Sequence, residues 1–261
     1  GALGLPAIDD LTSLANPVPT DLVERELERL KVLPEAELLL LEMAAQCGQQ
    51  FDAEDVAAGL GEGRMKVLNQ LRQVELEHGL IEDRNEDDRF SFLMRITRQA
   101  LCHRTIARRG AVTDEGEGIA EIARAFHAQV AESLIRRYEA TVAGDGRKVS
   151  GEKIYRHLSK AGPRQRKRAP EWALVAAEQA AQLFAFKRAK IWIARAIEEL
   201  PRPDEAQRDR MAFIYAQVLY AGGEQADRDE AMNRFKVLIA SPHVDARQAL
   251  LTWMEIAYEE K

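Results

Sequence analysis

The stretch GLGEG, residues 59–63, is glycine-rich, as phosphate-binding loops are. Such a loop requires the pattern G-x-x-x-x-G-K-[ST], because backbone amides and the lysine together hold the phosphates, and an acidic residue after a strand holds magnesium. Neither the Lys-Ser/Thr pair nor an acidic residue in that position is present here. The glycines are therefore interpreted as a turn ahead of a helix, and no nucleotide site is predicted.

The thiols and imidazoles form no catalytic pattern. Cys47 and Cys102 lie far apart without CxxC or Cys/His spacing, which predicts two reduced, buried thiols. No Ser/His/Asp or Cys/His set stands in a motif. His78, beside Gly79, is interpreted as a residue at the C-terminal end of a helix. We expect a chain that is not an enzyme and that has no catalytic residue, cofactor or metal.

One cluster of cations is a candidate docking site for a partner: Lys160, Arg164, Arg166, Lys167 and Arg168. It has no interleaved aromatic residues on which bases would stack, and the simplest interpretation is a solvated loop between helices. The alternative is a docking patch for an acidic partner or a phosphate. The three tryptophans fit helical packing and are expected in the core: Trp172, Trp192 and Trp253.

The composition predicts a soluble, globular protein. The chain has 261 residues, of which 46% are hydrophobic and 31% charged, with a formal net charge of −6. No apolar run reaches the ~18 residues that span a bilayer, and no secretory signal is visible, so we expect a cytoplasmic protein with no membrane partner. The acidic balance argues against broad affinity for nucleic acid. Gly1 in place of Met and a helical pattern running to Lys261 indicate a fragment of a larger protein.

Turn residues divide the first part of the chain into short helices. A leading helix is predicted over residues 22–30, with the apolar positions Leu22, Leu27 and Leu30. Pro34 fits the first turn of the next helix, which Gly48 ends and whose shared face is Leu38, Leu41 and Ala45. Asp52 is expected to cap a short helix that ends near Gly59.

A helix-turn-helix followed by a hairpin is predicted next. The turn at residues 61–63 leads into a helix that Gly79 ends and whose buried side is Val67, Leu71 and Val74. In LIEDRNEDDRFSFLM, residues 80–94, Phe90 and Phe92 alternate with Ser91 as in a strand with one buried side, which predicts a β-hairpin around residues 85–88. Three helices and a hairpin are the order of a winged helix.

The rest of the chain is predicted to be helical. A long amphipathic helix is expected from the stripe Ile119, Ile122, Phe126, Val130, Leu134 and Tyr138. From residue 170 a tetratricopeptide-like repeat begins, a helical hairpin of about 34 residues that needs small side chains where its two helices cross. Residues 170–203 supply Ala177, Ala189 and Ala196, and a looser unit over residues 204–242 supplies Ala216, Ala231 and Phe235. Residues 244–259 would begin a third unit.

The predicted fold class is mainly α. It comprises an N-terminal winged helix with a small β-hairpin, followed by a tetratricopeptide-like α-helical hairpin superhelix. The expected domains are a linker and leading helix over residues 1–33, the winged helix over 34–110 and the helical repeats over 111–261.

This order of elements resembles the C-terminal half of STAND-class signal-transducing ATPases. The resemblance is carried by DLVERELERLKVLPEAELLLLEMAAQCGQQFDAEDVAAGL, LEHGLIED and RFSFLMRITRQAL, and then by helical hairpins, from about Asp21 onward. In that family an AAA-like nucleotide-binding module precedes a winged helix and a superhelical sensor or scaffold. His78 and His103 match no motif of that family, so neither is assigned a role toward nucleotide.

The expected partner of the helix-turn-helix is a protein. Its predicted surface is Arg64, Lys66, Asn69 and Arg72, residue types that suit DNA. The hairpin, however, has two arginines and five acidic residues, which would repel the phosphates of DNA: Glu82, Asp83, Glu86, Asp87 and Asp88. We therefore expect a non-catalytic interaction and signalling module of a STAND-type ATPase, in which partner binding on the repeats is coupled to a nucleotide-binding module. The alternatives are a fragment of a DNA-binding transcriptional regulator with a tetratricopeptide-like sensor, and a purely architectural scaffold.

Overall fold

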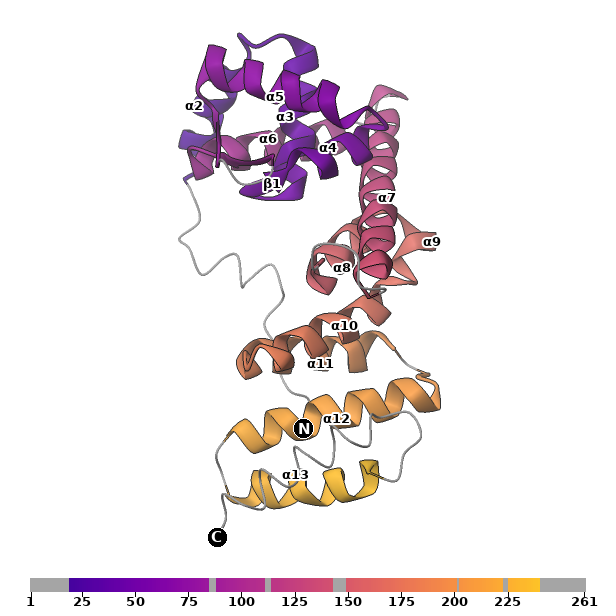
Figure 1. The fold of residues 1–261 in the computed structure, drawn as a ribbon. Coiled ribbons are helices and arrows are strands. Elements are labelled where there is room, and N and C mark those ends of the chain that lie inside the picture. Colours follow the sequence, from indigo (N-terminus) through magenta and orange to yellow (C-terminus); the bar gives the residue numbers. More distant parts are fainter. Residues whose placement is uncertain are drawn as a thin grey trace. The chain divides into compact units, whose positions relative to one another are not determined.

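The computed structural model of the chain describes residues 19–84, 88–110, 114–142, 149–200, 202–222 and 225–239. Within these residues the protein is mainly helical, with twelve helices and one small three-stranded sheet (Figure 1). The mainly α class with a small sheet, expected from the sequence, is confirmed. The described residues divide into two compact units, one within residues 1–146 and 160–162 and the other within residues 147–159 and 163–261.

Prolines and glycines set the helix boundaries of the first unit. The helices α2 (Thr20–Leu30) and α3 (Glu35–Cys47) each follow a proline, and α3 ends at Gly48 as predicted. The next two, α4 (Ala53–Leu60) and α5 (Arg64–His78), end at Gly61 and Gly79, whose φ angles are 68° and 56°. Glycine adopts this left-handed conformation without a Cβ clash, so it ends a helix at little cost. Two longer helices follow, α6 (Arg95–Gly110) and α7 (Asp114–Val142).

The sheet of the first unit has one strand that the sequence did not predict. Its strands are β1 (Gln50–Asp52), β2 (Ile81–Asp83) and β3 (Arg89–Phe92), in the antiparallel order β1-β3-β2. The predicted hairpin is the β2–β3 pair, in which Ile81 faces Phe92. The additional strand β1 pairs its Phe51 with Phe90. Three residues are too few to show the alternation by which a strand is recognised.

The buried side of α2 differs from the predicted one. Leu22 is exposed, Leu27 is half-buried, and the buried positions are Val23, Glu26 and Leu30. Glu26 is buried because it has a long-range partner, the hydroxyl of Thr97 on α6, which donates a hydrogen bond of 2.6 Å to Glu26 Oε1. A buried carboxylate with a hydrogen-bond donor avoids most of the desolvation cost that makes such burial rare.

Two further burial predictions are corrected. Ser91 is buried between Phe90 and Phe92 because β3 is the central strand, and its Oγ donates to Glu82 Oε1 at 2.9 Å. On α7, Ile122 is exposed, and the buried stripe is Ala123, Phe126, Val130 and Leu134. Phe126, Val130 and Leu134 are therefore buried as predicted, and the correction is that Ala123 is buried where Ile122 had been expected.

Helix α7 packs closely on α4. A Cβ added to Gly59 would lie 2.1 Å from a ring carbon of Phe126, so only glycine fits at this crossing. The fully buried Asp55 is bonded to Arg137 of α7, whose Nη1 also donates to Glu54 Oε2 at 2.9 Å. The described part of α7 lies within the first unit, on the other side of the predicted domain boundary at residues 110–111.

The second unit contains two antiparallel helical pairs. After α8 (Gly151–Lys160) and the short α9 (Pro163–Arg166) come α10 (Ala169–Gln182) and α11 (Phe186–Glu199), then α12 (Glu205–Gly222) and α13 (Gln225–Leu238). All six small or aromatic residues predicted at the helix crossings are fully buried: Ala177, Ala189, Ala196, Ala216, Ala231 and Phe235. The third expected unit, over residues 244–259, and Trp253 lie outside the described residues.

Overpacking either alanine of α11 should destabilise the second unit. Ala189 and Ala196 have no exposed surface, so Ala189→Leu or Ala196→Leu forces extra methyl groups into a filled crossing and should cost about 1–3 kcal/mol. Thermal unfolding followed by circular dichroism measures the change. The matched control is Lys190→Leu, an exposed position on the same helix, which should alter stability by less than about 0.5 kcal/mol. Equal melting temperatures for all three variants would contradict the assigned crossing.

Candidate interaction surfaces

The solvent-facing side of α5 is the first candidate surface. The structure places Arg64, Lys66, Asn69 and Arg72, the residues predicted there, at exposed positions. Two large apolar side chains, Met65 and Leu76, are also exposed, to 64% and 85%. Positions 65, 69, 72 and 76 follow the three- and four-residue spacing of one helical stripe, so Asn69 and Arg72 lie between the two apolar residues. The same helical spacing in the sequence is the signal by which Met65 and Leu76 can be placed on this surface, in addition to the predicted polar residues.

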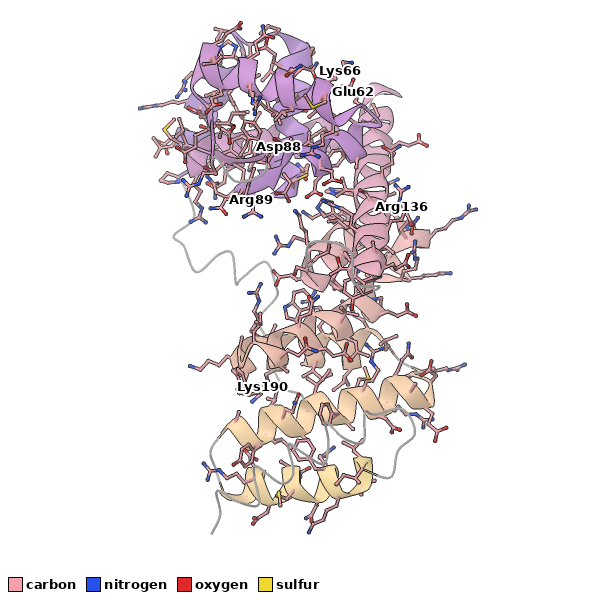
Figure 2. The ribbon with its side chains drawn as sticks, viewed as in Figure 1. Glu62, Lys66, Asp88, Arg89, Arg136 and Lys190 are labelled. Carbon is pink, nitrogen blue, oxygen red and sulfur yellow. The ribbon has the colours of Figure 1, made fainter. Side chains whose placement is uncertain are left out.

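The cations of the α5 surface are paired with carboxylates of the same unit. Arg64 Nε donates to Asp88 Oδ2 at 3.0 Å. Lys66 Nζ donates to Glu62 Oε1 at 2.8 Å, and Figure 2 labels these two residues. Arg72 Nη2 lies 3.9 Å from Asp83 Oδ2. A phosphate would therefore have to compete with an existing carboxylate partner for each of these cations.

Asp88 holds the start of β3 against two helices. Its φ angle is +63°, a left-handed conformation that aspartate tolerates better than most residues. Its backbone oxygen accepts a hydrogen bond of 3.0 Å from the amide of Ala53 at the start of α4, while its carboxylate accepts from Arg64 on α5. One hairpin residue thus connects the sheet to both helices of the predicted helix-turn-helix.

The hairpin is acidic, and its described arginines are also paired. Glu82 Oε1 accepts from Arg84 Nη1 at 2.8 Å and from Ser91 Oγ, and these two bonds lower the pKa of the Glu82 carboxyl. Arg89 Nε donates to Asp52 Oδ1 at 3.2 Å. Between residues 50 and 92 the sequence has eleven acidic side chains and five Lys or Arg, and each of those five has a carboxylate partner. Glu86 and Asp87 lie outside the described residues.

The basic cluster predicted as a docking patch is divided between the two units. Lys160 ends α8 and groups with the first unit, whereas Arg164 and Arg166 of α9, with Lys167 and Arg168 just after it, belong to the second. Arg164, Arg166 and Lys167 are exposed, and Arg168 Nη1 donates to Gln165 Oε1 at 2.9 Å. The described structure therefore brings four of the five cations together, in one segment.

The described residues include one group with metal-ligand chemistry. Carboxylate and imidazole atoms of Glu37, Glu77 and His78 lie within 4.8 Å of one another. His78 Nε2 forms a 2.8 Å hydrogen bond with Glu37 Oε2, which joins the end of α5 to α3. The imidazole nitrogen that would bind a cation is thus already used in a contact between helices, and we assign no metal to this group. His78 is the last residue of α5, as predicted.

The cysteines are free thiols in packed surroundings. Cys47 is buried at the end of α3, and Cys102 of α6 is partly buried, with its Sγ 3.7 Å from the backbone oxygen of Ala45. Burial raises the pKa of the Cys102 thiol, although nearby Arg98 opposes the shift. A thiol with a raised pKa is mostly protonated at neutral pH and is a poor nucleophile.

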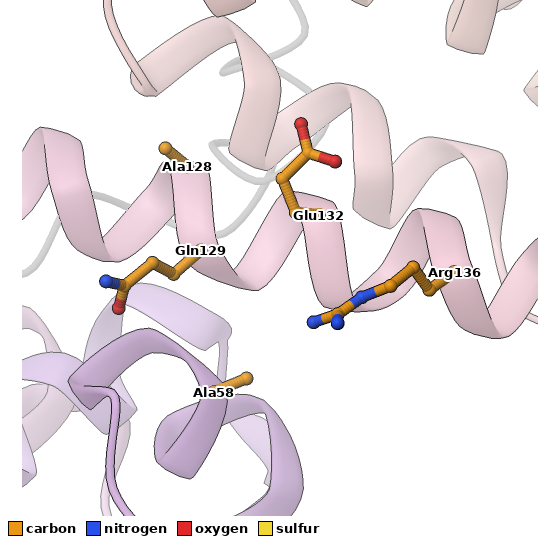
Figure 3. Close-up of a pocket in the computed structure, with 5 residues that line it drawn as sticks. All are labelled: Ala58, Ala128, Gln129, Glu132 and Arg136. Atoms are coloured by element: carbon orange, nitrogen blue, oxygen red, sulfur yellow. The ribbon is translucent and has the colours of Figure 1, made fainter.

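A pocket of about 260 Å³ lies between α4 and α7 (Figure 3). Its lining residues are Ala58, Ala128, Gln129, Glu132 and Arg136. Pockets that bind drug-sized molecules span about 300–1,000 Å³ and are mostly enclosed by apolar walls. This pocket is smaller and combines alanines with three polar side chains, so it suits a single side chain of a partner better than a cofactor.

Comparison with known proteins gives no match for this chain among protein-family models, curated proteins or solved structures. Among the described helices, none combines the length and the apolar character needed to cross a membrane.

Proposed function

We propose that this chain is a non-catalytic interaction and signalling module in which a winged helix precedes tetratricopeptide-like repeats, as the resemblance to STAND-class ATPases implies. The order α3-β1-α4-α5-β2-β3, with β1 added to the β2–β3 hairpin, supports the winged-helix part. Buried small residues at the helix crossings of the second unit support the repeat part.

One observation supports a protein partner over DNA most strongly: carboxylates pair with Arg64, Lys66 and Arg72. Binding to DNA depends on cations that neutralise phosphates and release counterions. Here each of these cations already has an acidic neighbour in the same unit. Met65 and Leu76 on the same helix face offer apolar area, which is what protein interfaces bury at their centre.

The proposed mechanism is a shift between two states of a larger switch. A partner bound on the repeats would favour one arrangement of the winged helix on an adjoining nucleotide-binding module, and thereby bias the on and off states. The coupling would be reciprocal, so nucleotide state would also change the affinity of the repeats for the partner.

The alternative, a fragment of a DNA-binding transcriptional regulator, rests on the same winged-helix order. It differs most clearly in its prediction for duplex DNA. A regulator would bind DNA tightly at low salt and lose that affinity steeply as salt rises, whereas an interaction module would bind weakly at every salt concentration.

The chain should neither bind nor hydrolyse ATP. The sequence contains no G-x-x-x-x-G-K-[ST] motif, so no backbone cradle and lysine are available for the phosphates. Isothermal titration with Mg-ATP should give only heats of dilution, and phosphate release should equal that of buffer. A one-to-one site of micromolar affinity would overturn the non-catalytic assignment.

A further inference from the structure

The turn between α10 and α11 places a phenylalanine where helices usually have glycine. Phe184 has φ +56°, and its amide donates to Ala181 O at 2.9 Å while the Ala185 amide donates to Ala180 O at 2.9 Å. These two bonds form a Schellman motif, in which the left-handed residue after the helix is glycine in most proteins because a Cβ is strained there.

The strain at Phe184 is not offset by burial of its ring. The side chain is 80% exposed, and the neighbouring Leu183 is 76% exposed. The ring of Phe184 meets that of Phe186 edge-on, with 6.1 Å between the centroids, so the two aromatic side chains hold each other in place. Residues held in strained backbone conformations by their surroundings cluster at functional sites. The turn therefore presents a pre-ordered apolar projection to solvent.

Two exposed lysines follow this turn on α11, in a segment of the sequence without acidic residues. No Asp or Glu occurs between Glu178 and Glu198, a segment that includes Lys187 and Lys190. Both lysines are exposed, and neither has an acidic partner among the described residues (Figure 2 labels Lys190). Helical spacing puts positions 187, 190 and 197 on one side of α11, and Ile197 there is also exposed.

We propose that this surface, named the α11 face and formed by Leu183, Phe184, Lys187, Lys190 and Ile197, binds an acidic amphipathic helix of a protein partner. Phe184 is the apolar anchor, and the two lysines pair with carboxylates of that helix. The inference rests on the proposed function, because it names the chemistry of the partner that the repeats receive. Aromatic anchors surrounded by charged groups are typical of the residues that dominate protein interfaces.

A membrane surface fits the α11 face less well than an acidic helix does. Segments that bind anionic lipid use clusters of about four to eight Lys or Arg. The α11 face has two lysines without acidic partners, since Arg188 is bonded to Glu152 and Arg195 lies beside Glu199. Two cations and three apolar side chains suit one part of a protein interface.

Selection from a library of random 16-residue peptides displayed on phage tests the proposal, with the whole chain as the target. The enriched peptides should carry a clear excess of Asp and Glu and have apolar residues three and four positions apart. Their affinity, measured by fluorescence anisotropy, should fall at least tenfold for Phe184→Gly and for the double variant Lys187→Glu with Lys190→Glu. The matched control Lys236→Glu, at an exposed position on α13, should leave it unchanged.

The glycine variant separates loss of binding from loss of folding. Glycine adopts the left-handed conformation without strain, so Phe184→Gly should raise the melting temperature by about 2–5 °C while it weakens peptide binding. Enriched peptides without an acidic excess, or affinities that Phe184→Gly leaves unchanged, would overturn the proposal. Binding to vesicles of 70% phosphatidylcholine and 30% phosphatidylglycerol with the same dependence on Phe184 would also overturn it. The Mg-ATP and DNA measurements do not involve the α11 face, so they test the proposed function separately.

Discussion

Arg137→Met is expected to lower the free energy of unfolding of the first unit by about 3–5 kcal/mol. Asp55 is fully buried under α7, and Arg137 is bonded to its carboxylate. Methionine keeps much of the side-chain volume but removes the cation to which the buried carboxylate is bonded. Truncating one member of a buried pair is costly mainly because of the charge that remains.

Urea unfolding followed by circular dichroism measures this change, and two matched variants define its origin. Glu54→Gln alters the exposed partner of the same arginine and should cost less than about 1 kcal/mol. The double variant Asp55→Ala with Arg137→Met removes both charges and should recover a large part of the loss. If Arg137→Met lowered the free energy of unfolding no more than Glu54→Gln does, the Asp55–Arg137 ion pair would not join α4 to α7 in the way described.

Phe235→Ala is expected to cost about 3–5 kcal/mol in the second unit. Phe235 of α13 has no exposed surface and forms a buried cluster with Ala216 and Ala231. Its ring meets that of Phe213 on α12 edge-on, with 5.7 Å between the centroids. Truncation therefore removes apolar burial and leaves a cavity between the two helices of the pair.

The control for Phe235→Ala is Val237→Ala on the same helix. Val237 is mostly exposed, so its truncation should change stability by less than about 0.5 kcal/mol. Thermal unfolding of the two variants beside the parent chain gives the comparison. A loss of less than 1 kcal/mol for Phe235→Ala would mean that α12 and α13 are not packed through this residue.

The helix boundaries could be predicted because the residues that set them act locally. Pro34 fixes its own φ angle, and Gly48 and Gly79 occupy backbone conformations that other residues reach only with strain. The residues at the helix crossings of the repeats could be predicted equally well, because two helices that pack closely need small side chains at a fixed spacing. Ala189 and Ala196 are buried where that spacing put them.

What the sequence could not provide are contacts between distant residues. Strand β1 is held by β3, some forty positions later. Asp52 occupies the N-cap position of α4 as predicted, but its side chain accepts from Arg89 and forms no capping hydrogen bond. Glu26 is buried only because Thr97 donates to it. None of these partners is visible in a local pattern of apolar and polar residues.

For the candidate surfaces, too, the exposed residues could be predicted from the sequence, whereas their long-range partners could not. Exposure of Arg64, Lys66 and Arg72 follows from helical periodicity and was predicted. The pairing of Arg64 with Asp88 and of Arg72 with Asp83 depends on the hairpin lying against α5, whereas Lys66 pairs locally with Glu62, four positions earlier. The acidic hairpin already indicated repulsion of DNA. The structure adds that the cations of α5 are themselves neutralised. Similarly, the strained conformation of Phe184 has no signature in the sequence beyond a phenylalanine at a helix end.

Binding of mixed-sequence duplex DNA as a function of salt tests the central claim, that the helix-turn-helix surface faces a protein, most directly. Fluorescence anisotropy with a labelled duplex at 50 and 200 mM salt would reveal a DNA reader, because six phosphate contacts would make affinity fall by about 10³-fold or more over that range. We predict weak or undetectable binding at both concentrations, and no measurable effect of Arg64→Ala combined with Lys66→Ala. Submicromolar binding that falls steeply with salt and is lost in the double variant would contradict the account and favour the transcriptional regulator.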